Sequence, residues 1–89
     1  MPSEFETIWR FNRSRSVALG QSWTEYTAAM RAHEEAIIEW AEATGRARDL
    51  HNVYVNISYD SVVAVFTDRD TALLAKISIV ADEQPPSQI

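Results

Sequence analysis

The sequence predicts an α+β domain: an antiparallel sheet of three to four strands packed on one long helix and one short helix, in the ferredoxin-like order β-α-β-β-α-(β). Three observations predict this class. Residues 22–45 carry a helical pattern between two capping signals. Residues 53–67 contain two β-branched runs separated by a short polar break, and residues 68–72 begin a second helix.

The first strand is expected over residues 5–11. Its bulky side chains Phe5, Trp9 and Phe11, together with Thr7, recur at every second position, which is typical of a half-buried strand. Residues 14–21, which include Gly20, are expected to form a loop.

The long helix is predicted from its two ends. Ser22-Trp23-Thr24-Glu25 forms a capping box, and Gly45 stands where a left-handed residue would end the helix. At 100° per residue, one stripe of the helix is mostly apolar and should face the sheet; it consists of Trp23, Tyr26, Met30, His33, Ile37, Trp40, Ala41 and Thr44. The opposite side carries Arg31, Glu35, Glu39 and Glu42.

Two strands follow, over residues 53–58 and 61–67, with Tyr59-Asp60 expected as a two-residue hairpin turn. That turn sorts the side chains by face because a strand alternates sides at each residue. The inner face would pair Ile57 with Val62, Val55 with Ala64 and Val53 with Phe66. The outer face would pair Ser58 with Ser61, Asn56 with Val63 and Tyr54 with Val65.

The short helix is expected to begin at Asp68, whose carboxylate can cap it. Leu73, Leu74 and Ile77 are expected to supply its apolar side, and residues 77–81 are the candidate for a final strand. We therefore expect a single domain over residues 1–81 and a flexible polar tail over residues 82–89.

The chemistry available to this chain is sparse. It has no cysteine and two histidines. The segment from His33 to Ile37 begins like a zinc-protease motif but carries isoleucine where the second ligand must stand. His33 is expected at the edge of the core, and His51 is expected on a surface loop beside Asp49. No nucleophile motif or phosphate-binding glycine loop occurs. We predict a protein that is not an enzyme, with no cofactor, metal site or small-molecule substrate.

The apolar content of the chain limits where the protein can be located. The longest apolar runs have five residues or fewer, as in Val62–Phe66, whereas a membrane span needs roughly 20. The first six residues are acidic and lack the apolar core of a signal peptide. These patterns predict a cytoplasmic protein that does not enter a membrane.

Three surfaces are candidates for binding. Helices on one face of the sheet would leave the other face open, with Tyr54, Val63 and Val65 exposed as an apolar patch. Replacing Val63 or Val65 with arginine would then abolish association without disturbing the fold. The second candidate is the acidic stripe of Glu35, Glu39 and Glu42, and the third is the basic cluster of Arg10, Arg13 and Arg15.

One segment resembles a known group of proteins. Val65–Ile77 is similar to small phage proteins in which a strand ending in Phe is followed by an Asp-Ala step, a Leu/Phe-Phe-Lys-Leu run and a closing strand. The resemblance covers about fifteen of the 89 residues. This chain departs from it with Thr71 before Ala72 and with Ala75 where an aromatic residue is usual. The resemblance implies a phage accessory protein that acts in the host cell, and it transfers no functional residue.

These observations favour a small acidic protein-binding module of net charge −5 that inhibits a host defence complex by protein contact, as anti-CRISPR proteins do. Self-association as a homodimer would use the same surfaces. One alternative is a single-stranded nucleic-acid-binding domain that uses Arg10, Arg13, Arg15 and Tyr54, although the negative charge opposes phosphate. Another alternative is a structural subunit of a virion or other homo-oligomer.

Overall fold

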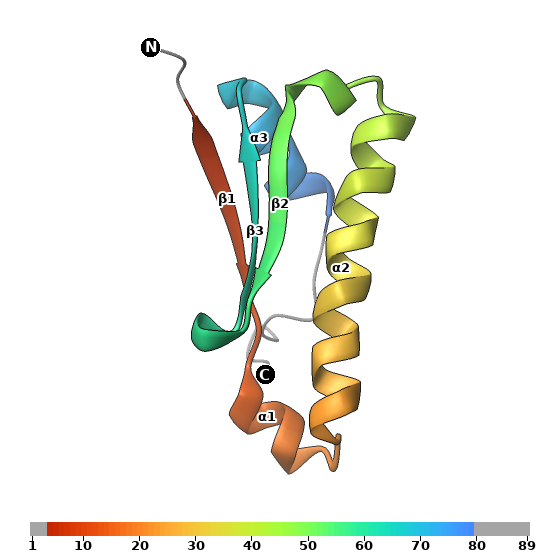
Figure 1. Ribbon diagram of the computed structural model, residues 1–89, viewed down its shortest axis with the longest axis vertical. Coiled ribbons are helices and arrows are strands. Elements are labelled where there is room, and N and C mark those ends of the chain that lie inside the picture. The colour runs from red at the N-terminus through yellow and green to blue at the C-terminus, as the bar shows by residue number, and fades with distance from the viewer. Residues whose placement is uncertain (1–3, 80–89) are drawn as a thin grey trace.

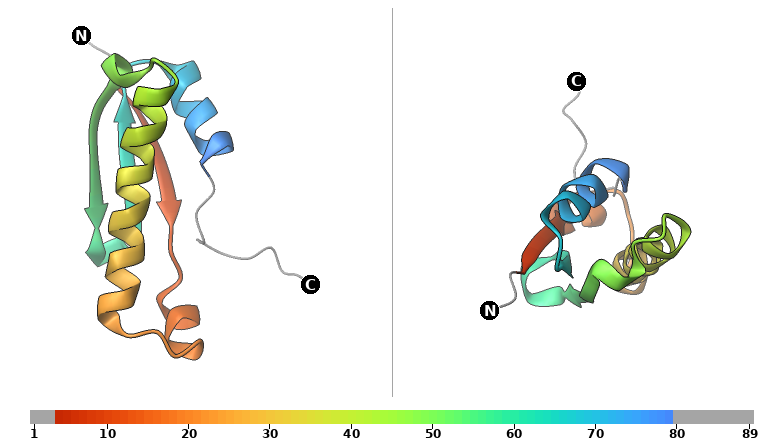
Figure 2. Two further views of the ribbon diagram at one scale, coloured as in Figure 1. Left: turned by 90° about the vertical axis from the view of Figure 1, so that its right-hand side faces the viewer. Right: turned by 90° about the horizontal axis from the view of Figure 1, so that it is seen from above.

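A three-stranded antiparallel sheet covered on one face by two helices forms the body of the protein (Figures 1 and 2). The computed structural model describes residues 4–79. The principal elements are β1 (Phe5–Arg10), α1 (Arg13–Ala18), α2 (Trp23–Ala43), β2 (Leu50–Asn56), β3 (Ser61–Phe66) and α3 (Arg69–Ser78). Two short 3-10 turns, η1 (Ala47–Asp49) and η2 (Ile57–Tyr59), flank β2.

The sheet has the order β1-β3-β2, with β3 antiparallel to both neighbours. β1 and β2 therefore run in the same direction with β3 between them, and α2 lies in the connection from one to the other. The predicted α+β class with an antiparallel sheet is confirmed. The final strand expected over residues 77–81 is not formed at its start, because residues 77 and 78 complete α3. Residues 80–81 and the expected tail, 82–89, lie outside the described residues.

The hairpin of β2 and β3 has the predicted faces but a different register. Val53 pairs with Ala64 and Val55 with Val62, two residues away from the expected partners. A shift of two leaves every side chain on its predicted face, since strand side chains alternate with period two. The turn is longer because Ile57 leaves the strand to begin η2, and Asp60 then closes it in the left-handed conformation with φ 52°. The prediction of a two-residue turn at Tyr59-Asp60 is therefore wrong.

The long helix α2 confirms both predicted caps. The Ser22 hydroxyl accepts from the Glu25 N–H at 3.0 Å, and the Glu25 carboxylate accepts from the Ser22 N–H at 2.7 Å. Gly45 follows the helix with φ 74°. The side chains buried against the sheet are Tyr26, Met30, His33, Ile37 and Ala41. The predicted stripe ends short of Trp23, which is exposed because the first turn of α2 extends past the sheet and lies near α1 (Figure 1).

The expected loop over residues 14–21 is wrong, since residues 13–18 form α1. The Asn12 side chain caps this helix by accepting from the Arg15 N–H at 2.9 Å. Ser16 is buried and its hydroxyl contacts Gln21 Oε1 at 2.7 Å, while Gly20 supplies φ 80° at the turn into α2. A capped polar segment can thus form a helix without an apolar stripe when local bonds hold both ends.

The helix α3 is capped by Asp68 as predicted, but it buries the side opposite to the expected one. Leu73, Leu74 and Ile77 are exposed, and the buried residues are Thr71, Ala72 and Ala75. These small side chains let the helix backbone approach β1 closely. Thr7 Oγ1 of β1 donates to the Ala72 carbonyl at 2.9 Å. The expected apolar side of α3 is therefore its outer surface.

The core lies between the inner face of the sheet and the helices α2 and α3. Its fully buried large side chains are Trp9, Phe66, Met30, Ile37 and Val62. Trp9 Nε1 donates to the carbonyl of Ile79 at 2.9 Å, which fastens the end of α3 over β1. Within residues 4–79, no helix combines the length and the apolar character needed to cross a bilayer.

Candidate interaction surfaces

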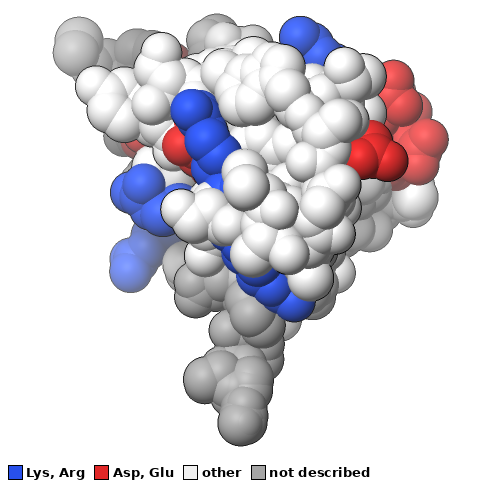
Figure 3. All heavy atoms as spheres, turned by 90° about the horizontal axis from the view of Figure 1, so that it is seen from below, with Lys and Arg blue, Asp and Glu red and all other residues white. Residues whose placement is uncertain are grey.

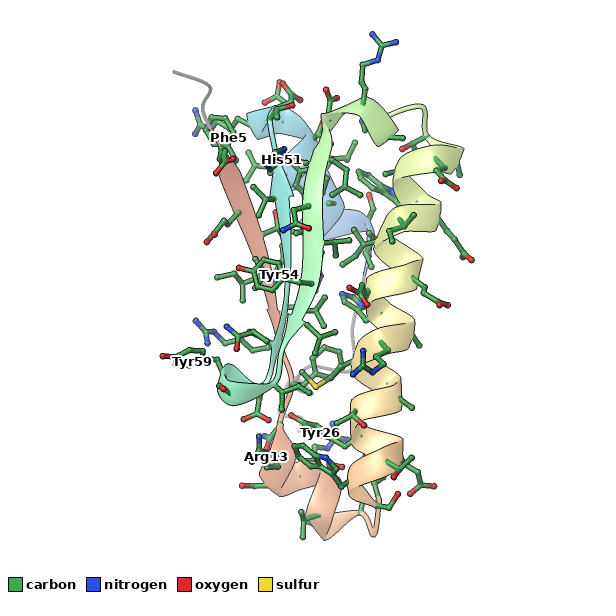
Figure 4. The ribbon with its side chains drawn as sticks, viewed as in Figure 1. Phe5, Arg13, Tyr26, His51, Tyr54 and Tyr59 are labelled. Atoms are coloured by element: carbon green, nitrogen blue, oxygen red, sulfur yellow. The ribbon has the colours of Figure 1, made fainter. Side chains whose placement is uncertain are left out.

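Within residues 4–79, no helix or strand covers the face of the sheet opposite α2 and α3, and two tyrosines project from this face. Tyr54 of β2 is 37% exposed and Tyr59 of η2 is 71% exposed. Both side chains point away from α2 (Figure 4). Between them and β1 lies a shallow hollow of about 200 Å³ lined by Ile8, Arg10, Val63 and the two tyrosines. The surface thus has an apolar floor and aromatic walls.

Val63 and Val65 form the floor of this face. They are buried, so the exposed apolar patch predicted at these residues is not formed. Val63 is 4% exposed and Val65 is 7% exposed. They lie on the central strand, where Val63 is flanked by Ile8 and Tyr54 and Val65 by Glu6 and Asn52. These longer neighbours cover the valines from both sides. Tyr54 also lies opposite Val63, and not opposite Val65 as the shorter turn implied.

Tyr59 also belongs to this surface, and the sequence did not predict it there. The expected two-residue turn placed Tyr59 at a hairpin tip, with no role on either face. In the structure, η2 brings Tyr59 beside the strand ends and into the lining of the hollow. The sequence signal was the lack of a favoured Asn-Gly pair at this turn, which indicates a longer connection.

The acidic stripe has the predicted position. Glu35, Glu39 and Glu42 are all exposed on α2, on the side away from the sheet. Acidic side chains gather on the α2 side when the molecule is seen from the end that carries α1 (Figure 3). This surface and the uncovered sheet face therefore lie on different sides of the protein.

The three arginines of the basic cluster do not form one patch. Arg10 is exposed at the end of β1, whereas Arg13 and Arg15 belong to α1. Basic side chains at this end of the molecule are separated by uncharged atoms (Figure 3). The Arg13 guanidinium contacts Asp60 Oδ1 at 2.9 Å, donates to the Ile57 carbonyl at 3.2 Å and lies 4.8 Å from the centre of the Trp23 ring. Arg13 therefore has structural partners on the hairpin turn and on α2.

Asp60 connects the hairpin turn to α1 through Arg13 and to α2 through Tyr26. Its Oδ1 also accepts from the Tyr26 hydroxyl at 2.9 Å, and Tyr26 and Arg13 lie close to each other beside the turn (Figure 4). Burial raises the pKa of Tyr26 to about 12, and the hydrogen bond and negative charge of Asp60 act in the same direction. This cluster combines a carboxylate, a phenol and a guanidinium, and its bonds are internal ones that hold the fold together.

The two histidines lie apart. His33 is buried, as predicted, at the edge of the core, where its ring packs edge-on against Trp9 with 4.8 Å between centroids. His51 belongs to β2 and not to the expected loop; it is exposed, with Nε2 3.5 Å from Glu4 Oε2. Among residues 4–79, no three histidine or carboxylate side chains are grouped to hold a metal ion. Comparison with protein-family models, curated proteins and solved structures gave no match.

Proposed function

We propose that this chain is a non-enzymatic protein-binding module that docks a partner protein on the uncovered face of its sheet. The observation that supports this proposal best is the pair of exposed tyrosines around the hollow on this face. Tyr54 belongs to β2, and Tyr59 belongs to the 3-10 turn η2. Tyrosine is among the residues that contribute most to protein interfaces, because it buries a large ring and keeps a polar tip.

The rest of the face suits a protein partner as well. The hollow has an apolar floor in Ile8 and Val63, while Glu6 and Arg10 place one charge of each sign at its rim. An apolar centre with a polar rim is the usual anatomy of a specific interface. If the chain is phage-encoded, as the resemblance at residues 65–77 implies, the partner would be a host protein such as a defence complex.

The experiment compares two matched variants of the intact chain. Tyr54→Arg with Tyr59→Arg changes the sheet face, and Glu35→Gln with Glu39→Gln and Glu42→Gln changes the acidic stripe by a similar number of exposed residues. A partner captured from host lysate is purified and titrated against each protein by calorimetry. We expect the tyrosine variant to bind at least about tenfold more weakly and the glutamate variant to bind as the parent does. The reverse order would move the binding surface to α2.

A second candidate function, single-stranded nucleic-acid binding, gains support from one observation. Tyr59 adds a second exposed aromatic side chain beside Tyr54, with Arg10 in the same hollow. Bases stack on such aromatic pairs in sheet-face RNA-binding domains. Titration of a labelled oligonucleotide at about 50 mM and about 200 mM salt tests this candidate. Tight binding that weakens with salt and is lost in Tyr54→Ala would favour it, and absence of binding at the lower salt would remove it.

A further inference from the structure

We propose that β1, along the edge that no other strand of residues 4–79 occupies, pairs with β1 of a second copy of this chain, antiparallel and centred on Ile8, so that two three-stranded sheets join into one of six strands. Among residues 4–79, β3 is the one strand that pairs with β1. This inference goes beyond the proposed function, because it concerns the backbone edge of β1 and needs no other protein, although Glu6 and Arg10 also lie at the rim of the hollow.

The backbone groups that face this edge follow from two hydrogen bonds. The N–H of Phe11 donates to the Asp60 carbonyl on the β3 side at 2.7 Å. The carbonyl of Ile8, in contrast, accepts from Lys76 Nζ at 2.7 Å. Because backbone groups alternate in direction along an antiparallel strand, Glu6, Ile8 and Arg10 direct their N–H and C=O groups away from β3.

β1 lacks two of the features that usually protect an edge strand, a proline and a β-bulge. It has six residues, contains no proline, and pairs with β3 in an unbroken register. Such an edge is a template for another strand. Lys76 shields one carbonyl, but a carbonyl oxygen has two lone pairs and can accept a second donor.

The charges of β1 are complementary to those of a second copy in one register. With Ile8 opposite Ile8 of the second copy, Glu6 lies opposite Arg10 of the second copy, and the two-fold axis repeats this pair. Opposite charges placed directly across a strand pair stabilise it. A shift of the centre to Glu6 or to Arg10 would place two like charges opposite each other. The charge pattern therefore favours the Ile8-centred pairing over these two registers.

The surface beside the edge has room for this pairing and apolar area to bury. A groove of about 500 Å³ runs between β1 and α3, with Leu73 in its lining. Leu73 is 54% exposed and Ile77, one turn later on the same side of α3, is 75% exposed. Joining the two β1 edges would bring α3 beside α3 of the second copy. The apolar side chains that the domain itself leaves exposed would then be covered.

The test uses the full chain and reverses the charges. Sedimentation equilibrium of the unchanged protein should give twice the 10.1 kDa chain mass at high concentration. Glu6→Arg alone and Arg10→Glu alone should each weaken the dimer by about tenfold or more, since each places like charges opposite each other twice. An equimolar mixture of the two variants should restore a heterodimer, because two arginines of one chain then face two glutamates of the other.

Matched controls keep the result decisive. Glu35→Arg makes the same charge change as Glu6→Arg but on α2, and it should leave the dimer unchanged. Circular dichroism checks that both exposed substitutions retain the fold. Hydrogen exchange on the unchanged protein should show the amides of Glu6, Ile8 and Arg10 becoming protected as concentration rises. A monomer at all concentrations, an association that ignores the Glu6 and Arg10 variants, or no restoration in the mixture would overturn the proposal.

Discussion

The hydroxyl of Tyr26 donates a hydrogen bond of 2.9 Å to Oδ1 of Asp60, a residue 34 positions further along the chain. The bond joins α2 to the hairpin turn, and Arg13 joins α1 to the same oxygen. Asp60 holds this position with φ 52°, a conformation that aspartate tolerates better than most residues. The closed end of the hairpin is therefore fastened by these side chains in addition to the backbone bonds that join Asp60 to Phe11 and Ile57.

Removing the Tyr26 hydroxyl should weaken this fastening. We expect Tyr26→Phe to lower the free energy of unfolding by about 1–2 kcal/mol, because a partly buried bond to a carboxylate is lost while the ring remains packed. Denaturant titration followed by circular dichroism measures the change. Tyr59→Phe is the control, since its side chain is exposed. Equal effects of the two substitutions would contradict the structural role of Tyr26.

The same bond predicts a loss of stability in alkaline solution. The pKa of Tyr26 is raised to about 12 in the folded protein, against an ordinary value of 10.0. Its contribution to stability is therefore fully present below about pH 10 and is lost as pH rises towards 12, because the unfolded chain releases its proton first. Unfolding measured across this range should show the difference between the parent and Tyr26→Phe shrinking. A difference that stays constant would count against the raised pKa.

The pKa of Asp68 is lowered, so its contribution to the free energy of unfolding should be lost as pH falls and not as pH rises. Hydrogen bonds from the Thr71 hydroxyl at 2.7 Å and the Thr71 N–H at 2.9 Å lower the pKa of Asp68 below its usual value of 3.8. The stabilisation is present above about pH 3.8 and is lost as pH falls through the lower folded value. Nuclear magnetic resonance titration of the carboxyl measures it directly. Asp68→Asn should reduce the acid sensitivity of unfolding more than Asp70→Asn, which leaves the capping residue of α3 in place.

The burial of Val63 predicts that arginine at this position disrupts the fold. We expect Val63→Arg to lower the free energy of unfolding by about 3 kcal/mol or more, because a charge would enter a position covered by Ile8 and Tyr54. Tyr54→Arg, on the same face but partly exposed, should cost less than about 1 kcal/mol. Thermal unfolding of both variants checks the order. Comparable stabilities would show that the valine is not buried in solution.

The local parts of the fold could be predicted from sequence because their signals lie within a few residues. The capping box of Ser22 and Glu25, the glycine after α2 and the cap at Asp68 each depend on bonds over three or four positions. The alternation of β1 and of the hairpin strands predicted the correct faces for the same reason. The buried side of α2 from Tyr26 to Ala41 also follows from helical period alone.

What only the tertiary structure decided is how closely the elements approach and what covers each side chain. Small residues bring α3 against β1, and this closeness turns Leu73 and Ile77 outward although they are the more apolar side chains. The bonds of Asp60 to Tyr26 and Arg13 hold a turn two residues longer than the pattern indicated. Val63 is buried because β1, which is distant in the chain, and β2, which runs antiparallel to β3, place longer side chains on both sides of it. Such contacts depend on pairs of residues far apart in sequence, and no pattern within one segment contains them.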